Sequence, residues 1–412
     1  MKSSYWLTNT KLESGYYFEN DSIVGTKTES CHLRIEEGKI AQILSVQEPL
    51  QTELPIVDGK HMLLLPSFQE MHIHLDKTYH GGPWKACTPV SNLFERHEED
   101  KGLLPMFLSK SQERAELVLE LMLQNGIMRI RDHCHVDPQV GLKFLEALQR
   151  AYEPFSGRIS REIVAFPHYG LLRTNAKESV REALRQGATH VGGVDPAGVD
   201  GDVEKSLQTM MELAVENNVD VDLHLHDPGH LTLFTIKRLA ALTEEAGWEG
   251  RVTISHALGL GDISLSEVSE VAERLAQLRI DITSTVPINR LTIPIPLLHE
   301  KGVLVSLGND GVLGNWSPFG STDILEKANR LAERFRWSDE RSLSRALGFI
   351  TGGKIPLNET GTRIWPVVGD EASGVFVDSS CSAETVARRA KPQAVIAKGY
   401  VMGKIEPYLL KG

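Results

Sequence analysis

Two histidines stand two residues apart in the stretch PSFQEMHIHLDKTYHGGP (66–83), which follows an apolar run. Residues i and i+2 of a β-strand point to the same side of the sheet. The side chains of His72 and His74 should therefore point together, about as far apart as two imidazoles that share one metal ion. The rest of the chain must then supply further ligands.

Similar polar residues follow other apolar segments that read as strands. The segment VDVDLHLH contributes His224 and His226, the segment RVTISHA contributes His256, and the segment GVLVSLGND contributes Asp310. The 15 histidines of the chain would give about half an H-x-H pair in random order, whereas three occur. Such enrichment at strand ends predicts one polar site.

The third pair, His133 and His135 in RDHCHVD, is the least informative. A single cation cannot use every histidine around a rim, and we expect His135 to lie beside the site rather than in it. Three further histidines, His80, His97 and His230, fall in segments that we expect to be solvated loops.

Imidazoles and a carboxylate that leave room for water form a common catalytic arrangement around zinc or iron. One divalent ion is expected, either zinc, iron or manganese, because imidazole-rich sites accept all three. The ion would lower the pKa of bound water toward neutrality. Asp310 could then carry a proton to a leaving nitrogen, and His256 could polarise the group under attack.

The elements that would position these residues alternate strand and helix about eight times. The strand candidates span residues 62–74, 126–135, 161–167, 190–195, 219–226, 251–257, 279–285 and 302–310. This spacing predicts a (β/α)8 TIM-like barrel, whose functional residues lie at the carboxyl ends of the strands. A doubly wound open sheet is the alternative, but no G-x-G-x-x-G phosphate turn follows an early strand.

Both ends of the chain show short alternating strands separated by turns, as in HLRIEEGKIAQIL and AVIAKGYVMGKI. We predict that residues 1–61 and 360–412 form one small β-sandwich domain, and that residues 62–359 form the barrel. The connection TYHGGPWKACTPVSNLFERHEEDKGLLP (78–105) is far longer than a usual strand-to-helix loop. We expect it to be a lid above the catalytic face, with a solvated surface insertion as the alternative, followed by a helix near Ser109.

The charge and hydropathy of the chain limit its partners. A net charge of −11 argues against nucleic acid or an anionic membrane. The chain has no run of about 18 apolar residues and no apolar signal core. The four cysteines are scattered, which is typical of reduced thiols in the cytoplasm. The expected partners are small molecules and further copies of the chain in a homo-oligomer.

The strand-end residues also carry a family resemblance. The motifs HIHLDK, VAFPHYG, VGGVDPA, VDVDLHLHD, RVTISHA and NWSPFG resemble the amidohydrolase superfamily, most closely its cytosine deaminase and N-isopropylammelide amidohydrolase branch. The resemblance implies His256 as an electrostatic residue. It implies a single ion held by His72, His74, His224 and Asp310. Binuclear members carry a lysine after the fourth strand, where this chain has Asp195.

Some residues depart from cytosine deaminase itself. His168 stands where that enzyme has a glutamine that binds the substrate ring, and Asp227 stands where it has a glutamate. The sequences HLDK and HLHD resemble the isopropylammelide enzyme and imply that Lys77 and His226 act near the substrate. The isopropylammelide enzyme also has glutamine at the position of His168. These departures disfavour cytosine as the substrate and do not establish isopropylammelide.

Two further residues have roles that the residue pattern leaves open. Asp195 would contact the substrate, orient a neighbouring histidine or merely end its strand. Trp316 would form a wall of the pocket or pack under the next helix. Together the patterns predict a metal-dependent hydrolase that cleaves a C–N bond of a small nitrogen heterocycle. Deamination is the first expectation, and dealkylamination or ring opening of a cyclic amide are the alternatives. A non-catalytic metal-binding or ligand-binding protein is the alternative of another class.

Overall fold

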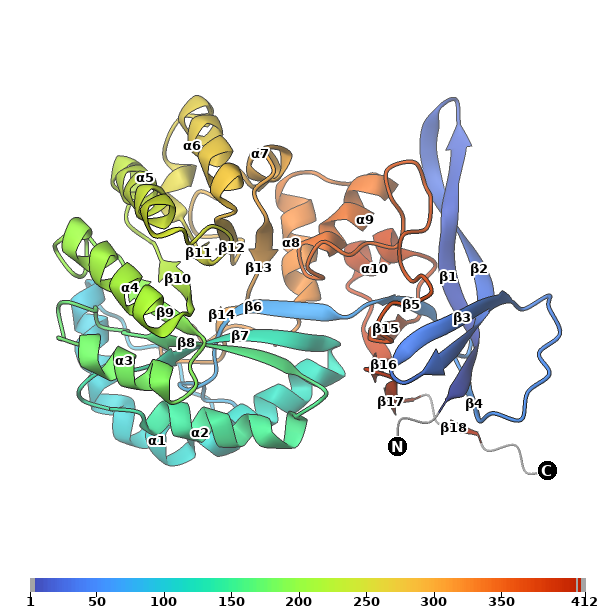
Figure 1. The fold of residues 1–412 in the computed structure, drawn as a ribbon, viewed down its shortest axis with the longest axis horizontal. Helices are drawn as coiled ribbons and strands as arrows, with labels where there is room; N and C mark the ends of the chain where they lie inside the picture. The colour runs from blue at the N-terminus through green and yellow to red at the C-terminus, as the bar shows by residue number, and fades with distance from the viewer. Residues whose placement is uncertain (1–3, 405–406, 409–412) are drawn as a thin grey trace.

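The computed structural model describes residues 4–404 and 407–408, which form two sheets and their flanking helices. One sheet is parallel and ringed by helices, and the other is mostly antiparallel and built from both ends of the chain (Figure 1). The predicted barrel with a small β-rich domain is confirmed. The domain boundaries stay a prediction.

The parallel sheet follows the order β13-β12-β11-β10-β9-β8-β7-β6-β14. Its strands are β6 (Phe68–His74), β7 (Ile127–His135), β8 (Ser160–Phe166), β9 (His190–Val194), β10 (Asp220–His224), β11 (Val252–Ser255), β12 (Asp281–Ser284), β13 (Val305–Leu307) and β14 (Asp310–Gly311). The last two are consecutive pieces of one barrel strand. Because β13 pairs with β12 and β14 pairs with β6, this strand brings the two edges of the sheet together.

Helices cover the outside of the parallel sheet (Figure 1). They are α1 (Leu93–Gln124), α2 (Lys143–Tyr152), α3 (Lys177–Arg185), α4 (Val203–Asn217), α5 (Gly229–Ala246), α6 (Leu265–Leu278), α7 (Ile295–Glu300) and α8 (Leu325–Arg334). Two further helices, α9 (Glu340–Gly348) and α10 (Ser382–Arg388), lie between this sheet and the second one (Figure 1). Local signals explain several ends. Ser264 and Glu267 form a capping box at the start of α6, and Gly247 takes a left-handed conformation after α5.

The second sheet joins segments that lie far apart in the sequence. It contains β1 (Tyr5–Glu19), β2 (Ser22–Glu36), β3 (Lys39–Ser45), β4 (Ile56–Asp58), β5 (Leu63–Pro66), β15 (Gly374–Val377), β16 (Pro392–Ala397), β17 (Tyr400–Gly403) and β18 (Pro407–Tyr408). The central pairing of β5 with β15 connects the two ends of the chain, and β5 leads directly into β6 of the barrel. The two sheets are therefore tied at the first barrel strand.

The connection at residues 78–105, which was expected to form a long lid loop, contains a shorter loop than predicted. Helix α1 begins at Leu93, not near Ser109, and continues through Pro105. Asn92 caps it by accepting a hydrogen bond from the backbone N–H of Glu95, and the Glu95 carboxylate in turn accepts one from the N–H of Ser91. This reciprocal arrangement is readable in the sequence SNLFE. Proline at residue 105 made the segment resemble a loop.

No helix within residues 4–404 and 407–408 combines the length and apolar character that crossing a bilayer requires.

Candidate metal centre

The end of β6 brings His72 and His74 to one side of the strand, with ring centroids 5.4 Å apart. Each ring uses its Nδ1 in a contact with the protein. The Nδ1 of His72 lies 2.8 Å from the Ser255 hydroxyl, and that of His74 lies 3.1 Å from the carbonyl oxygen of His133. Both rings are thereby fixed with Nε2 left to face a common point.

The carboxylate of Asp310 faces the same point. Its Oδ1 lies 3.6 Å from Nε2 of His72 and 3.4 Å from Nε2 of His74. Asp310 has a φ of +65°, and the chain reaches it through Gly308, which packs against the backbone of His72. A side chain at residue 308 would meet the Cβ of His72 at 2.4 Å. Glycine is therefore required for this approach.

His224, from the end of β10, lies beside His74. Its Nε2 lies 3.3 Å from Nε2 of His74. Ligands placed tetrahedrally at metal bonds of about 2.1 Å are separated by about 3.4 Å. The three distances of 3.3, 3.4 and 3.6 Å agree with that spacing. We call His72, His74, His224 and Asp310 the candidate ligand cluster.

The chemistry of this cluster fits a divalent ion. Burial lowers the pKa of His72 and, more strongly, that of His224, which keeps both imidazoles neutral and able to donate a lone pair. Partial desolvation alone would raise the pKa of Asp310, but the facing imidazoles hold it well below its ordinary value. Within the described residues, Nε2 of His72 is buried without a hydrogen-bond partner. A bound cation would satisfy it.

His256 and His226 lie beside the candidate ligand cluster. The ring centroid of His256 is 4.6 Å from that of His72 and 4.4 Å from that of His226. Nδ1 of His226 lies 2.9 Å from Oδ2 of Asp195, and Oδ1 of Asp195 accepts from the backbone N–H of His226. Burial alone would lower the pKa of His226, but Asp195 raises it. Asp195 therefore orients a histidine here.

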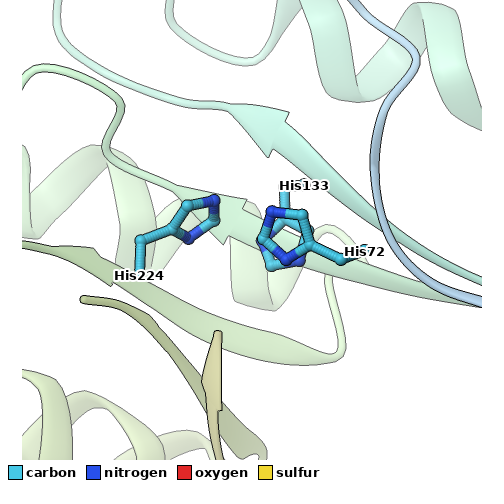
Figure 2. A group of neighbouring side chains, drawn as sticks. All are labelled: His72, His133 and His224. Carbon is cyan, nitrogen blue, oxygen red and sulfur yellow. The ribbon is translucent and has the colours of Figure 1, made fainter. Parts of the chain in front are cut away.

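A second set of three imidazoles overlaps the cluster and was missed by sequence reasoning. His133, from β7, lies with His72 and His224 so that one nitrogen from each falls within 4.8 Å of the others (Figure 2). All three side chains are buried. The register that pairs Ile73 with Asp132 brings His133 level with His74. That register joins strands distant in sequence, and no local pattern reveals it.

Lys77 makes a buried ion pair that the sequence did not indicate. Its Nζ lies 2.8 Å from Asp100 of helix α1, and Tyr169 donates a hydrogen bond of 2.7 Å to the same carboxylate. Burial alone would raise the pKa of Asp100, but Lys77 and Tyr169 hold it below its ordinary value. Lys77 is thereby tied to the helix that covers one side of the barrel mouth.

His97 was expected in a solvated loop, and that prediction is wrong. It lies in α1, is 4% exposed, and its ring is 5.7 Å from those of His168 and Trp316. His168 is in turn 6.4 Å from the ring of His74. These rings therefore extend the site from the candidate ligand cluster toward helix α1.

The remaining predicted residue, Asp227, is turned partly into the protein. It is 6% exposed, and its Oδ1 accepts from the backbone N–H of Gly198 at 3.1 Å. A cavity of about 280 Å³ opens beside His226, and Arg290, Leu291 and Leu258 contribute to its lining. This cavity leads from solvent to the histidine that Asp195 orients.

Comparison with known proteins gives a consistent family. Residues 183–405 match the model of the amidohydrolase family. The uncharacterised protein YahJ of Escherichia coli strain K12 is 40% identical over 97% of this chain and 87% of its own length. N-isopropylammelide isopropyl amidohydrolase of Pseudomonas sp. strain ADP is 29% identical over 85% of this chain and 88% of its own.

A solved structure agrees with these relatives. N-isopropylammelide isopropylaminohydrolase from Burkholderia multivorans superposes with a TM-score of 0.85 at 28% identity, over 97% of this chain and 98% of the other.

Proposed function

The chain belongs to the amidohydrolase family, and from this premise we propose that it hydrolyses the bond between a ring carbon and an exocyclic nitrogen of a small heterocycle. The protein is a hydrolase of C–N bonds other than peptide bonds. The proposal adds the substrate class and the position of the bond, with ammonia or an amine as the leaving group.

The convergence of Nε2 of His72, Nε2 of His74 and Oδ1 of Asp310 is the observation that carries the proposal. Together with His224 these residues would hold one divalent ion. Such an ion supplies a Lewis acid that brings the pKa of water near neutrality. The donor set of imidazoles and one carboxylate suits zinc, iron or manganese, and the choice among them stays a prediction.

Proton movement is assigned to Asp310. Its Oδ1 faces the cluster, and its side chain is 42% exposed, so that it can reach both the attacking water and the leaving nitrogen. The low pKa of this carboxyl keeps it ionised, so that it has a free lone pair to accept a proton. After taking the proton from water, it would pass that proton to the departing amine.

Charge that develops on the substrate would be stabilised by the two histidines beside the cluster. His256 is placed next to His72, where it can donate to a ring nitrogen or oxygen that gains negative charge. His226 stands next to it, and Asp195 fixes its ring so that Nε2 is the free nitrogen. Asp195 would thus act through His226 and not on the substrate.

The ring of the substrate would lie between the candidate ligand cluster and helix α1. His168 and Trp316 have rings 5.1 Å apart, and both nitrogens of His168 lack a hydrogen-bond partner within the described residues. These nitrogens could pair with polar edges of a heterocycle. Direct contact of Lys77 or Asp227 with the substrate stays a prediction, because each already binds another group.

The leaving group separates the proposed reaction from its alternatives. Deamination releases ammonia, dealkylamination releases an alkylamine, and ring opening of a cyclic amide leaves a new carboxylate on the product. The names of the isopropylammelide enzymes indicate that relatives remove an alkylamine. Both amine and ammonia release are therefore included in the proposal.

Cytoplasmic location and assembly into a homo-oligomer remain predictions from the sequence.

The test is a screen of the metal-analysed protein against aminopyrimidines, N-alkylaminotriazines and pterins, with ammonia, alkylamine and new carboxylate measured separately. We expect ammonia or amine from at least one class. Asp310→Asn should abolish that release while the protein stays folded. An unchanged rate in this variant, or a product with a new carboxylate and no amine, would contradict the proposal. A protein that binds metal but turns over none of these compounds would contradict the proposed substrate class.

A further inference from the structure

The cavity of about 280 Å³ beside His226 contains two charged side chains that the proposed reaction does not use. Its volume is close to the lower limit of about 300 Å³ for small-molecule sites, so it suits a substituent or a small ring. Charges act more strongly beside apolar walls than in open water. The cavity is lined by His226, Pro228, Leu258, Asp262, Arg290 and Leu291.

Arg290 lies on the connection between β12 and α7, at the carboxyl end of the parallel sheet. The Thr292 hydroxyl donates a hydrogen bond of 3.3 Å to the carbonyl oxygen of Pro287, which closes this connection into a loop. Gly261 packs against the loop so closely that a Cβ there would meet the carbonyl oxygen of Leu291 at 3.0 Å. Loops at this end of a barrel bind the substrate, and this one is held in place.

The guanidinium of Arg290 is available for a ligand. Arg251, which precedes the adjacent strand β11, forms an ion pair with Asp220 at 2.7 Å. Arg290 is exposed and forms no such ion pair within residues 4–404 and 407–408, although Asp262 lies in the same cavity lining. The two opposite charges of the cavity therefore do not neutralise each other by direct contact.

The charge of Arg290 acts at the inner end of the cavity. Burial and the charge of Arg290 each lower the pKa of His226, whereas Asp195 raises it above its ordinary value. The whole chain carries a net charge of −11, so its overall field repels anions. A negatively charged group beside His226 would therefore depend on a local cation, and Arg290 supplies one.

We propose that Arg290 binds an anionic substituent of the substrate, so that the enzyme prefers heterocycles that carry a carboxylate or a phosphate group. The inference rests on the proposed function, to which it adds this substrate feature. The ring would lie between the candidate ligand cluster and α1, and the substituent would extend past His226 into the cavity.

The guanidinium suits this role because its planar fork can donate two parallel hydrogen bonds to one oxyanion. Asp262 would instead select a cationic substituent. The anionic choice follows from the charge that acts on His226, which is that of Arg290.

The test compares compounds that differ in the charge of the substituent. For each ring class that the screen turns over, the carboxylate, the neutral carboxamide and the cationic aminomethyl derivative are assayed with the metal-loaded enzyme. A pterin carboxylate and its carboxamide form one such pair. The kcat/KM for the carboxylate should exceed that for the carboxamide about tenfold or more. A phosphate derivative shows which anion fits better, and high salt should reduce the preference.

Arg290→Gln should lower the ratio of kcat/KM for carboxylate over carboxamide about tenfold or more. Arg290→Lys keeps the charge but loses the fork, so it should retain part of the ratio. Arg334→Gln is the matched control. Arg334 is exposed at the end of α8, forms no ion pair within the part of the chain that the structure describes, and does not line the cavity. This variant should keep the wild-type ratio, and thermal unfolding would show whether each variant folds.

The outcomes separate the two proposals. A wild-type ratio near one, an unaltered ratio in a folded Arg290→Gln protein, or a preference for the aminomethyl compound would overturn the role of Arg290 and leave the proposed function intact. If no compound is turned over, the proposed function fails, and calorimetric binding of a pterin carboxylate and its carboxamide still decides the role of Arg290. Tighter binding of the carboxylate that Arg290→Gln abolishes would support this role, and equal affinities would overturn it.

Discussion

Replacement of Asp195 by asparagine tests how the site orients His226. Asp195 accepts three hydrogen bonds, from Nδ1 of His226 at 2.9 Å and from the backbone N–H groups of His226 and Asp227. Asparagine can keep the two backbone bonds through its single carbonyl oxygen. Its amide NH₂ then faces Nδ1, which forces the ring to place its proton on the other nitrogen or to turn away.

The expected decrease in kcat follows from the hydrogen bond to His226 that Asp195→Asn removes. A hydrogen bond to a charged group contributes about 1.5–3 kcal/mol, and about 1.4 kcal/mol corresponds to a factor of ten in rate. If His226 acts on the leaving or ring nitrogen, kcat of Asp195→Asn should fall roughly 10- to 150-fold. KM should change little, since no contact between Asp195 and the substrate is proposed. Steady-state kinetics on the best substrate of the screen measure both.

Asp137→Asn supplies a matched control for this experiment. Oδ2 of Asp137 lies 2.9 Å from Nε2 of His135, and its Oδ1 accepts from the backbone N–H groups of Gln139 and Val140. The two carboxylates thus have the same pattern of partners, but only Asp195 serves a histidine beside His256. The two variants should lose similar thermal stability. An Asp195→Asn protein that is folded and within about twofold of the wild-type kcat would refute the reasoning.

Three further predictions concern the metal centre. Chelation of the ion should abolish turnover and lower the unfolding temperature. A divalent ion added back at 100 times its Kd should raise the free energy of unfolding by about 2.7 kcal/mol. Full activity in protein shown to be metal-free would exclude the assigned ion. Ser255→Ala removes the hydroxyl that lies 2.8 Å from Nδ1 of His72. Metal affinity measured by chelator competition should fall about 10- to 100-fold. An affinity equal to that of the wild type would show that Ser255 does not orient His72 for metal binding. Gly308→Ala places a Cβ 2.4 Å from that of His72 and should lower both metal content and unfolding temperature. Gly102→Ala, where a Cβ meets nothing within 4 Å, should lower neither, and metal content retained in Gly308→Ala would show that the contact is relieved elsewhere.

Some features of the fold were readable because they depend on short-range patterns. Alternating strand and helix segments predicted the barrel, and turn-rich strands at both ends predicted the second sheet. The start of α1 at Leu93 was also encoded locally, in the capping pattern around Asn92, but Pro105 obscured it. Proline removes one helical hydrogen bond without preventing the helix from continuing when tertiary packing holds both sides.

Among the residues of the site, too, short-range patterns predicted some features and only the tertiary structure decided others. The sequence by itself determined which residue types end the barrel strands and that His72 and His74 share a face, because side chains alternate along a strand. Only the tertiary structure decided that His133 lies level with His74, that Asp100 meets Lys77, and that His97 is buried. The register between strands and the packing of α1 fix these neighbours, and both arise from barrel closure between segments far apart in the chain.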